Sequence, residues 1–153
     1  MLLKDISFVI PVYNRPNEID ELLKSFSRLE GDKDFEIVII EDGSTEKCDH
    51  IVKSFSDLNI SYHLKSNSGP GDSRNYGMSV AKGKYYVILD SDVILPVNYN
   101  VLLIENLIND FSDCFGGVDD SHQSFNNFQK AVSYSMTSFI TTGHIRGGSK
   151  SKD

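Results

Sequence analysis

Residues 6–44 read ISFVIPVYNRPNEIDELLKSFSRLEGDKDFEIVIIEDGS, and this stretch decides the fold. Residues 6–12 and residues 35–44 are mainly apolar and rich in β-branched side chains, a pattern typical of buried strands. Residues 17–30 between them have the periodicity of an amphipathic helix, which Asn17 is expected to cap. The inward face of that helix carries Ile19, Leu22, Leu23, Phe26 and Leu29. A helix between two continuously apolar strands predicts a parallel strand pair in an α/β domain.

The rest of the chain continues this alternation of strands and helices. The expected elements are a helix at 49–58, a strand at 60–64, a helix at 72–81, a strand at 84–90, a helix at 99–111, a short strand at 114–118 and a helical pattern at 125–140. This order predicts a three-layer α/β/α sandwich around a mostly parallel sheet. Because the 153 residues contain no internal repeat and no linker, we expect a single domain over residues 1–153.

The composition argues against several classes of protein. A net charge of −7, a pI near 5.0 and the lack of any basic run argue against nucleic-acid binding. No apolar run approaches the roughly 18 residues that span a bilayer, and no signal-peptide pattern opens the sequence. Cys48 and Cys114 lie far apart in the sequence, which favours two reduced thiols over a disulfide. The four histidines lack the spacing of zinc ligands. We therefore expect a cytoplasmic protein, either free or bound peripherally at the inner membrane face.

Polar clusters follow each of the four expected strands. They are PVYNRP at 11–16, EDGS at 41–44, SNSGPGDSRN at 66–75 and DSD at 90–92. In open α/β sheets, ligands bind beyond the carboxyl ends of the strands. The four clusters together therefore predict a ligand pocket at one edge of the sheet.

The DSD cluster has the character of a cation site. On an extended backbone Asp90 and Asp92 point the same way, with Cα atoms about 6–7 Å apart. Like charges this close repel unless a cation lies between them or one carboxyl is protonated. Mg²⁺ or Mn²⁺ would accept these carboxylates and leave coordination positions open for phosphate oxygens. The alternative is a solvated turn that carries two surface acids.

The EDGS and SNSGPGDSRN clusters suit the nucleoside and the phosphates of a ligand. Glu41 and Asp42 could accept hydrogen bonds from a base or a ribose, although Asp42, Ser44 or Thr45 could equally cap the following helix. Arg74 lies in the expected first turn of a helix, where backbone N–H groups and a guanidinium favour a diphosphate. Its alternative role is an ion pair with an acid at a strand end. The loop matches neither a Walker A motif nor G-x-G-x-x-G.

Together the segments FVIPVYNRP, IVIIEDGSTE, SGPGDSRNYG and YYVILDSDV resemble, in order and spacing, the nucleotide-binding half of family-2 glycosyltransferases with the GT-A fold. The resemblance covers essentially the whole chain. FGGVDD and QKAVSYSMTSFITTGHIRGG are also similar to the middle section of bacterial members. The resemblance implies a GT-A sheet that binds a nucleotide-diphosphate sugar, of which a UDP-sugar is the expected kind.

The resemblance also implies a role for each matching position on the nucleoside side. Pro11, Val12 and Tyr13 match the segment that flanks the nucleoside. Glu41 and Asp42 match the acids that contact ribose and base, and Asp42 is similar to the residue that reads the uracil edge in UDP-dependent members.

The positions nearer the phosphates match in the same way. Arg15 matches a basic position that faces phosphate. Arg74 matches an arginine that lies beside the nucleobase and the acid that contacts this base. Asp90 would face ribose or metal, Ser91 would lie at the donor, and Asp92 would link Mn²⁺ or Mg²⁺ to the diphosphate.

The implied reaction is an inverting transfer of the sugar to an acceptor hydroxyl in polysaccharide or glycoconjugate synthesis. The acceptor would be a glycan or a lipid-linked molecule. The family's catalytic base lies in a later acidic motif that has no match within 153 residues, so no catalytic residue is assigned. Asp119 and Asp120 lie too early to match it. We therefore expect the donor half of the enzyme with the acceptor half largely absent, and a chain that transfers poorly on its own.

Three other classes compete with this interpretation. A nucleotide-sugar-binding module without activity agrees with the missing base. An NDP-sugar nucleotidyltransferase would need a glycine-rich loop after the first strand, where PVYNRP has no glycine. A receiver-like signalling domain would need its acids after the first and third strands, whereas here they follow the second and fourth.

Overall fold

The computed structural model describes residues 3–114, 116, 127–128, 131 and 134. The chain divides into two units, residues 1–111 and residues 112–153, and the fold below is that of the first unit. The expected strand at 114–118 and helix at 125–140 lie mostly outside the described residues, so a single domain over 1–153 stays a prediction. No helix in the described part of the chain is long and apolar enough to cross a membrane.

The sheet has four parallel strands, which follow a short 3₁₀ turn at Leu3–Asp5. The strands are β1 (Ile6–Val12), β2 (Glu36–Asp42), β3 (Ile60–Lys65) and β4 (Tyr85–Ile88), in the order β3-β2-β1-β4. All three neighbouring pairs are parallel, so the carboxyl ends of the four strands meet at one edge.

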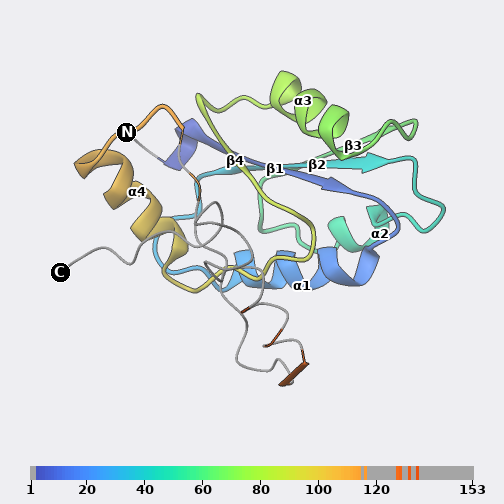
Figure 1. Cartoon of the computed structure of the whole chain (residues 1–153), viewed down its shortest axis with the longest axis horizontal. Coiled ribbons are helices and arrows are strands. Elements are labelled where there is room, and N and C mark those ends of the chain that lie inside the picture. The colour runs from blue at the N-terminus through green and yellow to red at the C-terminus, as the bar shows by residue number, and fades with distance from the viewer. Residues whose placement is uncertain (1–2, 115, 117–126, 129–130, 132–133, 135–153) are drawn as a thin grey trace. The chain divides into compact units, whose positions relative to one another are not determined.

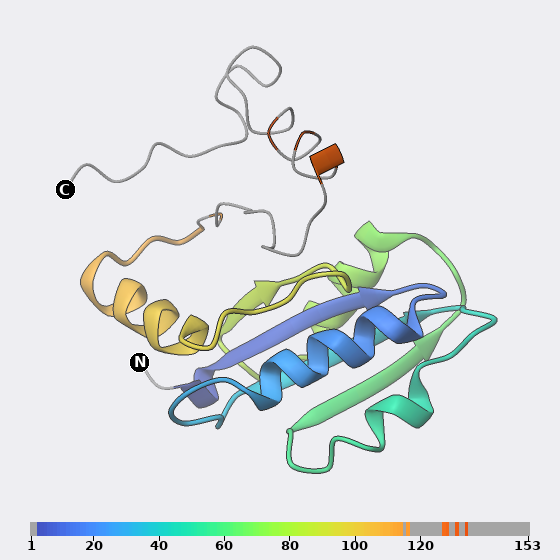
Figure 2. The same ribbon diagram turned by 90° about the horizontal axis from the view of Figure 1, so that it is seen from below.

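Helices cover both faces of this sheet (Figure 1). The helix α3 (Pro70–Val80) lies on one face, while α1 (Pro16–Ser27) and the short α2 (Asp49–Val52) lie on the other. Figure 2 shows α1 running across its face of the sheet, nearly along the strands. The helix α4 (Tyr99–Asn109) contributes Leu103 and Leu107 to the core on the α1 side. The predicted α/β sandwich with a parallel sheet is therefore confirmed.

The core on the α1 side is built around Phe8 of β1. Its ring meets Phe26 of α1 edge-on at 4.9 Å between centroids, and Phe35 at 5.1 Å. All three side chains are almost completely excluded from solvent. Burying an aromatic side chain of this size contributes about 1.5–3 kcal/mol, so this cluster fixes α1 against the sheet.

On the opposite face, α3 approaches the sheet through a glycine. A Cβ atom added to Gly77 would lie 2.4 Å from Val9 Cγ1 and 3.2 Å from Ile40 Cγ1. Because real Cβ atoms do not come so close, only glycine lets α3 pack this tightly on β1 and β2. The position of Arg74, three residues earlier on this helix, depends on that contact.

The start of β4 is held by a buried polar cluster. Ser7 Oγ donates to Glu36 Oε2 at 2.6 Å, and the backbone N–H of Lys82 donates to the same oxygen at 2.8 Å. Gly83 N donates to Ser7 Oγ at 2.9 Å, where a Cβ on Gly83 would lie 2.7 Å from Ser7 N. These contacts fix where β4 begins beside β1, and so where its carboxyl end delivers residues 90–92.

Several local predictions were wrong. The helix α1 begins at Pro16, whose ring suits the first turn, so Asn17 lies inside the helix and does not cap it. The helix expected at 49–58 is the single turn of α2. The strand expected at 84–90 spans only Tyr85–Ile88. Because α3 packs on β1 and β2, one face of β4 is left open, and Tyr86 and Ile88 are 44% and 43% exposed.

Candidate functional site

The four strand-end clusters meet at one pocket, as the sequence predicts. Its volume is about 370 Å³, and it lies at the carboxyl ends of the strands. The residues that line it are Pro11, Val12, Tyr13, Arg15, Asp42, Pro70, Arg74, Asp90, Ser91 and Asp92. Every residue predicted for the site is present except Glu41. Pro70, in the first turn of α3, also lines the pocket and was not predicted individually, although it belongs to the SNSGPGDSRN cluster.

The two acids of the DSD cluster each face an arginine from another segment. Arg74 Nη2 lies 2.7 Å from Asp90 Oδ1, and Arg15 Nη1 lies 2.8 Å from Asp92 Oδ2. The aspartate side chains are 64% and 55% exposed. Exposed ion pairs of this kind contribute at most about 1 kcal/mol. A ligand that offers phosphate to the arginines or a cation to the aspartates could therefore exchange partners at little cost.

The backbone on both sides of residues 90–92 is fixed by the core. Leu89 N donates to Val9 O at 3.1 Å, which extends the pairing with β1 one residue beyond β4. On the other side Leu95 N donates to the buried Ser25 Oγ of α1 at 3.2 Å. The two acids therefore lie on a short segment that is anchored at both ends, a suitable base for a rigid ligand site.

The donor chemistry of the DSD cluster fits a hard divalent cation. Asp90 and Asp92 supply carboxylate oxygens at one pocket, and in the described structure arginine contacts only one oxygen of each carboxylate. No group of three or more His, Cys, Asp or Glu residues that could hold a metal occurs among the described residues. A cation here would therefore take most of its ligands from phosphate and water, as Mg²⁺ and Mn²⁺ do at nucleotide sites.

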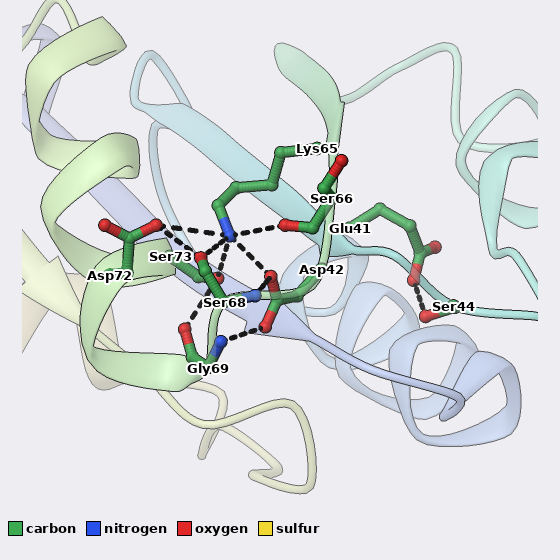
Figure 3. Close-up of polar contacts among 9 residues, drawn as sticks. All are labelled: Glu41, Asp42, Ser44, Lys65, Ser66, Ser68, Gly69, Asp72 and Ser73. Carbon is green, nitrogen blue, oxygen red and sulfur yellow. Dashed lines mark hydrogen bonds and ion pairs between the residues drawn. The ribbon is translucent and has the colours of Figure 1, made fainter.

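Asp42 is the buried acid of the pocket, with only 3% of the residue exposed. Its carboxylate accepts hydrogen bonds from Lys65 Nζ at 2.5 Å, Ser68 N at 3.0 Å and Gly69 N at 2.9 Å (Figure 3). Burial alone would raise the pKa of Asp42, but the bonds from Lys65 and the two amides outweigh it and hold the pKa below the usual value. Asp42 is therefore an ionised acceptor at neutral pH.

Glu41 lies on the other face of the sheet. It is fully buried, and it accepts hydrogen bonds from Ser44 Oγ, from Cys48 N at 2.9 Å and from Tyr62 Oη at 3.0 Å. Successive side chains of a strand alternate between faces, so Asp42 faces the pocket and Glu41 does not. Both acids were expected to contact the ligand, whereas Glu41 lies where it joins β2 to β3 and to the loop before α2.

Cys48 belongs to this Glu41 cluster. Its Sγ lies 3.0 Å from Glu41 Oε2, and burial, followed by the hydrogen bond to the carboxylate, raises the pKa of the thiol far above its usual value. Such a thiol is inert as a nucleophile. Cys48 and Cys114 are both free. Cys48 occupies the N-cap position of α2, and no side chain caps this helix. The cap expected from Asp42, Ser44 or Thr45 is therefore not formed.

Asn14 joins two of the loops at the pocket and was not predicted. Its Oδ1 accepts hydrogen bonds from Thr45 N at 2.8 Å and Glu46 N at 3.1 Å, while its own N–H donates to Ser44 Oγ at 2.8 Å. The residue adopts φ of 52°, a left-handed conformation that asparagine tolerates. Asn14 thereby fixes the turn that presents Tyr13 and Arg15 to the pocket. An asparagine before a proline-started helix is the signal that could have identified it.

Comparison with known proteins identifies the family. The sequence model described as Glycosyl transferase family 2 matches residues 7–151. An uncharacterized glycosyltransferase of Rickettsia conorii is 46% identical over 88 residues, which are 57% of this chain and 14% of that protein. The chain thus aligns with only a small part of its relative.

Solved structures agree with this match. The crystal structure of S. aureus TarS 1-349 in complex with UDP has a TM-score of 0.66 and 28% identity, and the match covers 71% of this chain and 33% of that one. The mannosyltransferase PcManGT from Pyrobaculum calidifontis, solved with GDP-Man and Mn²⁺, shares the fold at a TM-score of 0.62 and 21% identity, over 69% of this chain and 32% of that one. These likenesses confirm the predicted GT-A fold. Because the family match spans nearly the whole sequence, the chain belongs to glycosyltransferase family 2.

Proposed function

We propose that this chain is the donor-binding region of a metal-dependent, inverting glycosyltransferase that uses a UDP-sugar. The observation that carries the proposal is the pocket at the carboxyl ends of the strands, where Asp42, Arg74, Asp90 and Asp92 converge. TarS, which is similar in fold and sequence, was solved with UDP. The family membership supports transfer of a sugar, and it argues against a nucleotidyltransferase.

The binding mode follows from the chemistry of the pocket walls. The nucleoside would lie against Pro11, Val12 and Tyr13, with the ionised Asp42 accepting a hydrogen bond from the base. The diphosphate would lie between Arg15 and Arg74, whose guanidinium groups suit phosphate oxygens. Each arginine would then exchange its aspartate partner for phosphate.

Asp90 and Asp92 would hold a divalent cation against the diphosphate, with Ser91 between them. The cation, when bound, supplies the positive charge that stabilises the departing nucleotide diphosphate. Arg15 and Arg74 add positive charge at the same place without any proton transfer. All three carboxylates at the pocket are engaged by Lys65, Arg74 or Arg15, so none of them is assigned as the base that deprotonates the acceptor.

For the acceptor, only a chemical class is proposed. The acceptor would be a hydroxyl of a glycan or lipid-linked molecule, and the place of reaction would be the cytoplasm or the inner face of the membrane. A nucleotide-sugar-binding module without transfer activity is the second candidate, because no described carboxylate at the pocket is free to act as a base. Measuring UDP-sugar hydrolysis beside UDP-sugar binding separates the two, since a binding module shows only the second.

A thermal-shift panel tests the proposed donor class. UDP, GDP, CDP and dTDP are compared with Mn²⁺ and with EDTA. The expected result is the largest rise in melting temperature for UDP with Mn²⁺, and a much smaller rise with EDTA, because ligand binding to the folded state raises stability by mass action. A rise that is equal with EDTA contradicts the metal dependence. The lack of a rise with any nucleotide contradicts the proposal as a whole.

A further inference from the structure

Lys65 is not among the residues that line this pocket, and it contributes instead to the wall of a second pocket of about 490 Å³. It is the last residue of β3 and pairs in register with Asp42, the last residue of β2. Its side chain is only 15% exposed. Nζ donates to Asp42 Oδ1 at 2.5 Å, to Ser66 O at 3.1 Å, to Ser73 Oγ at 3.3 Å and to Ser68 Oγ (Figure 3). A lysine with this many fixed partners is held in one position.

The protein donors that contact Asp42 do not use all of its acceptor positions. Oδ1 accepts from Lys65 Nζ and Ser68 N, which occupies both of its lone pairs. Oδ2 accepts from Gly69 N, so within the described structure one lone pair of Oδ2 has no donor. Because Asp42 also lines the pocket, a ligand there meets a carboxylate that has one acceptor position to offer.

We propose that Lys65 is a positioning residue that keeps Asp42 a permanent hydrogen-bond acceptor, and that it thereby makes the pocket select nucleobases with a ring N–H. Uracil, thymine and guanine carry such a donor. Cytosine and adenine present a ring nitrogen lone pair at the equivalent position, which a carboxylate repels. This inference deepens the proposed function and rests on it, since it requires a nucleotide in the pocket.

The charges around Asp42 show why Lys65 is needed. Asp42 is almost completely buried, and burial favours its neutral form. Lys65 is the one cation that contacts it in the described structure, while Asp72 lies 3.3 Å from Lys65 on the solvent side. The other charged groups at the pocket are Arg15, Arg74, Asp90 and Asp92, which pair with one another. Without Lys65, Asp42 would take up a proton more readily, and its carboxyl could then donate to the ring nitrogen of cytosine.

Two amides oppose that change but do not replace Lys65. Ser68 N and Gly69 N also hold the pKa of Asp42 down, so a variant without the lysine keeps part of the acceptor character at neutral pH. The loss of base selectivity should therefore grow as the pH falls. A purely structural role of Lys65 would weaken all nucleotides alike at every pH.

The test measures dissociation constants of UDP and CDP by calorimetry with Mn²⁺, at pH 7.5 and pH 6.0. The proteins are the wild type, Lys65→Met and the control Lys53→Met, which removes an exposed lysine that pairs with Asp49 on α2. Using the ratio of the two constants cancels titration of the phosphates, which both ligands share. In Lys65→Met the preference for UDP should fall about tenfold, and further at pH 6.0. In Lys53→Met it should match the wild type.

A double-mutant cycle shows whether Lys65 acts through Asp42. Adding Lys65→Met to Asp42→Asn should leave the UDP-to-CDP ratio where Asp42→Asn alone puts it. If Lys65→Met does not fold, Lys65→Gln, which keeps a shorter polar side chain, should lower the ratio in the same direction. Equal weakening of UDP and CDP by Lys65→Met overturns the role of Lys65 while the proposed function stands. Failure of the wild type to bind either nucleotide overturns both.

Discussion

Glu41 and Asp42 are neighbours on β2, yet their carboxylates lie on opposite faces of the sheet. Asp42 lines the pocket, and Glu41 accepts hydrogen bonds from Ser44, Cys48 and Tyr62 beneath it. The sequence places both acids at a strand end, and strand alternation gives them different surroundings. The partner of Asp42 could not be predicted, because Lys65 meets it only through the register of β2 with β3.

The cluster around Glu41 should be structural. We expect Glu41→Gln to lower the free energy of unfolding by about 2–3 kcal/mol, because its amide would place a donor against the N–H and O–H donors that now meet a carboxylate. UDP affinity should stay unchanged in the folded variant. Urea denaturation measures the first effect and UDP titration the second. Glu46→Gln changes an exposed glutamate nearby and should leave both unchanged. A loss of UDP affinity without a loss of stability would contradict the structural role and indicate that Glu41 contacts the ligand.

At the scale of the elements, α3 links the packing of the sheet to the pocket. Gly77 rests on Val9 and Ile40, while Arg74 and Pro70 on the same helix line the pocket. The order of the elements and the parallel sheet were predictable, since continuous apolar runs alternate with amphipathic helices. The short α2 and the exposed face of β4 were not, because they depend on which strands each helix covers. Hydrophobic runs alone do not contain that information.

Gly77→Ala tests this link. Alanine favours a helix by up to about 1 kcal/mol over glycine, so an isolated α3 would gain stability. We expect a net loss of about 1–3 kcal/mol instead, because the new Cβ would overlap Val9 and push α3 away from the sheet. UDP affinity should fall as Arg74 moves. Gly71→Ala on the same helix meets no atom within 4 Å and should be neutral or stabilising. Chemical denaturation that finds Gly77→Ala as stable as Gly71→Ala would contradict the close packing.

At the scale of the whole molecule, the parallel sheet brings together residues that are distant in sequence. Arg15 and Asp92 are 77 positions apart and meet at 2.8 Å, and Arg74 and Asp90 meet at 2.7 Å. Convergence of the strand-end clusters followed from the topology rule for α/β sheets and was predicted from sequence. The choice of partners was not, because it depends on where α3 and the loop after β1 place their arginines. Asn14, which fixes that loop, was also missed: its place before Pro16 was a local signal, but its partner Thr45 lies 31 positions further along the chain.

The central claim is that the pocket binds a nucleotide diphosphate through a cation held by Asp90 and Asp92. Calorimetric titration of UDP in the presence of Mn²⁺, into the wild type and into Asp92→Asn, tests it most directly. Asp57→Asn changes an exposed aspartate elsewhere and serves as the matched control. We predict that Asp92→Asn weakens UDP binding at least about tenfold, the effect of losing one charge-assisted contact, while Asp57→Asn binds as the wild type does. Equal UDP affinity in the wild type and Asp92→Asn would contradict the claim.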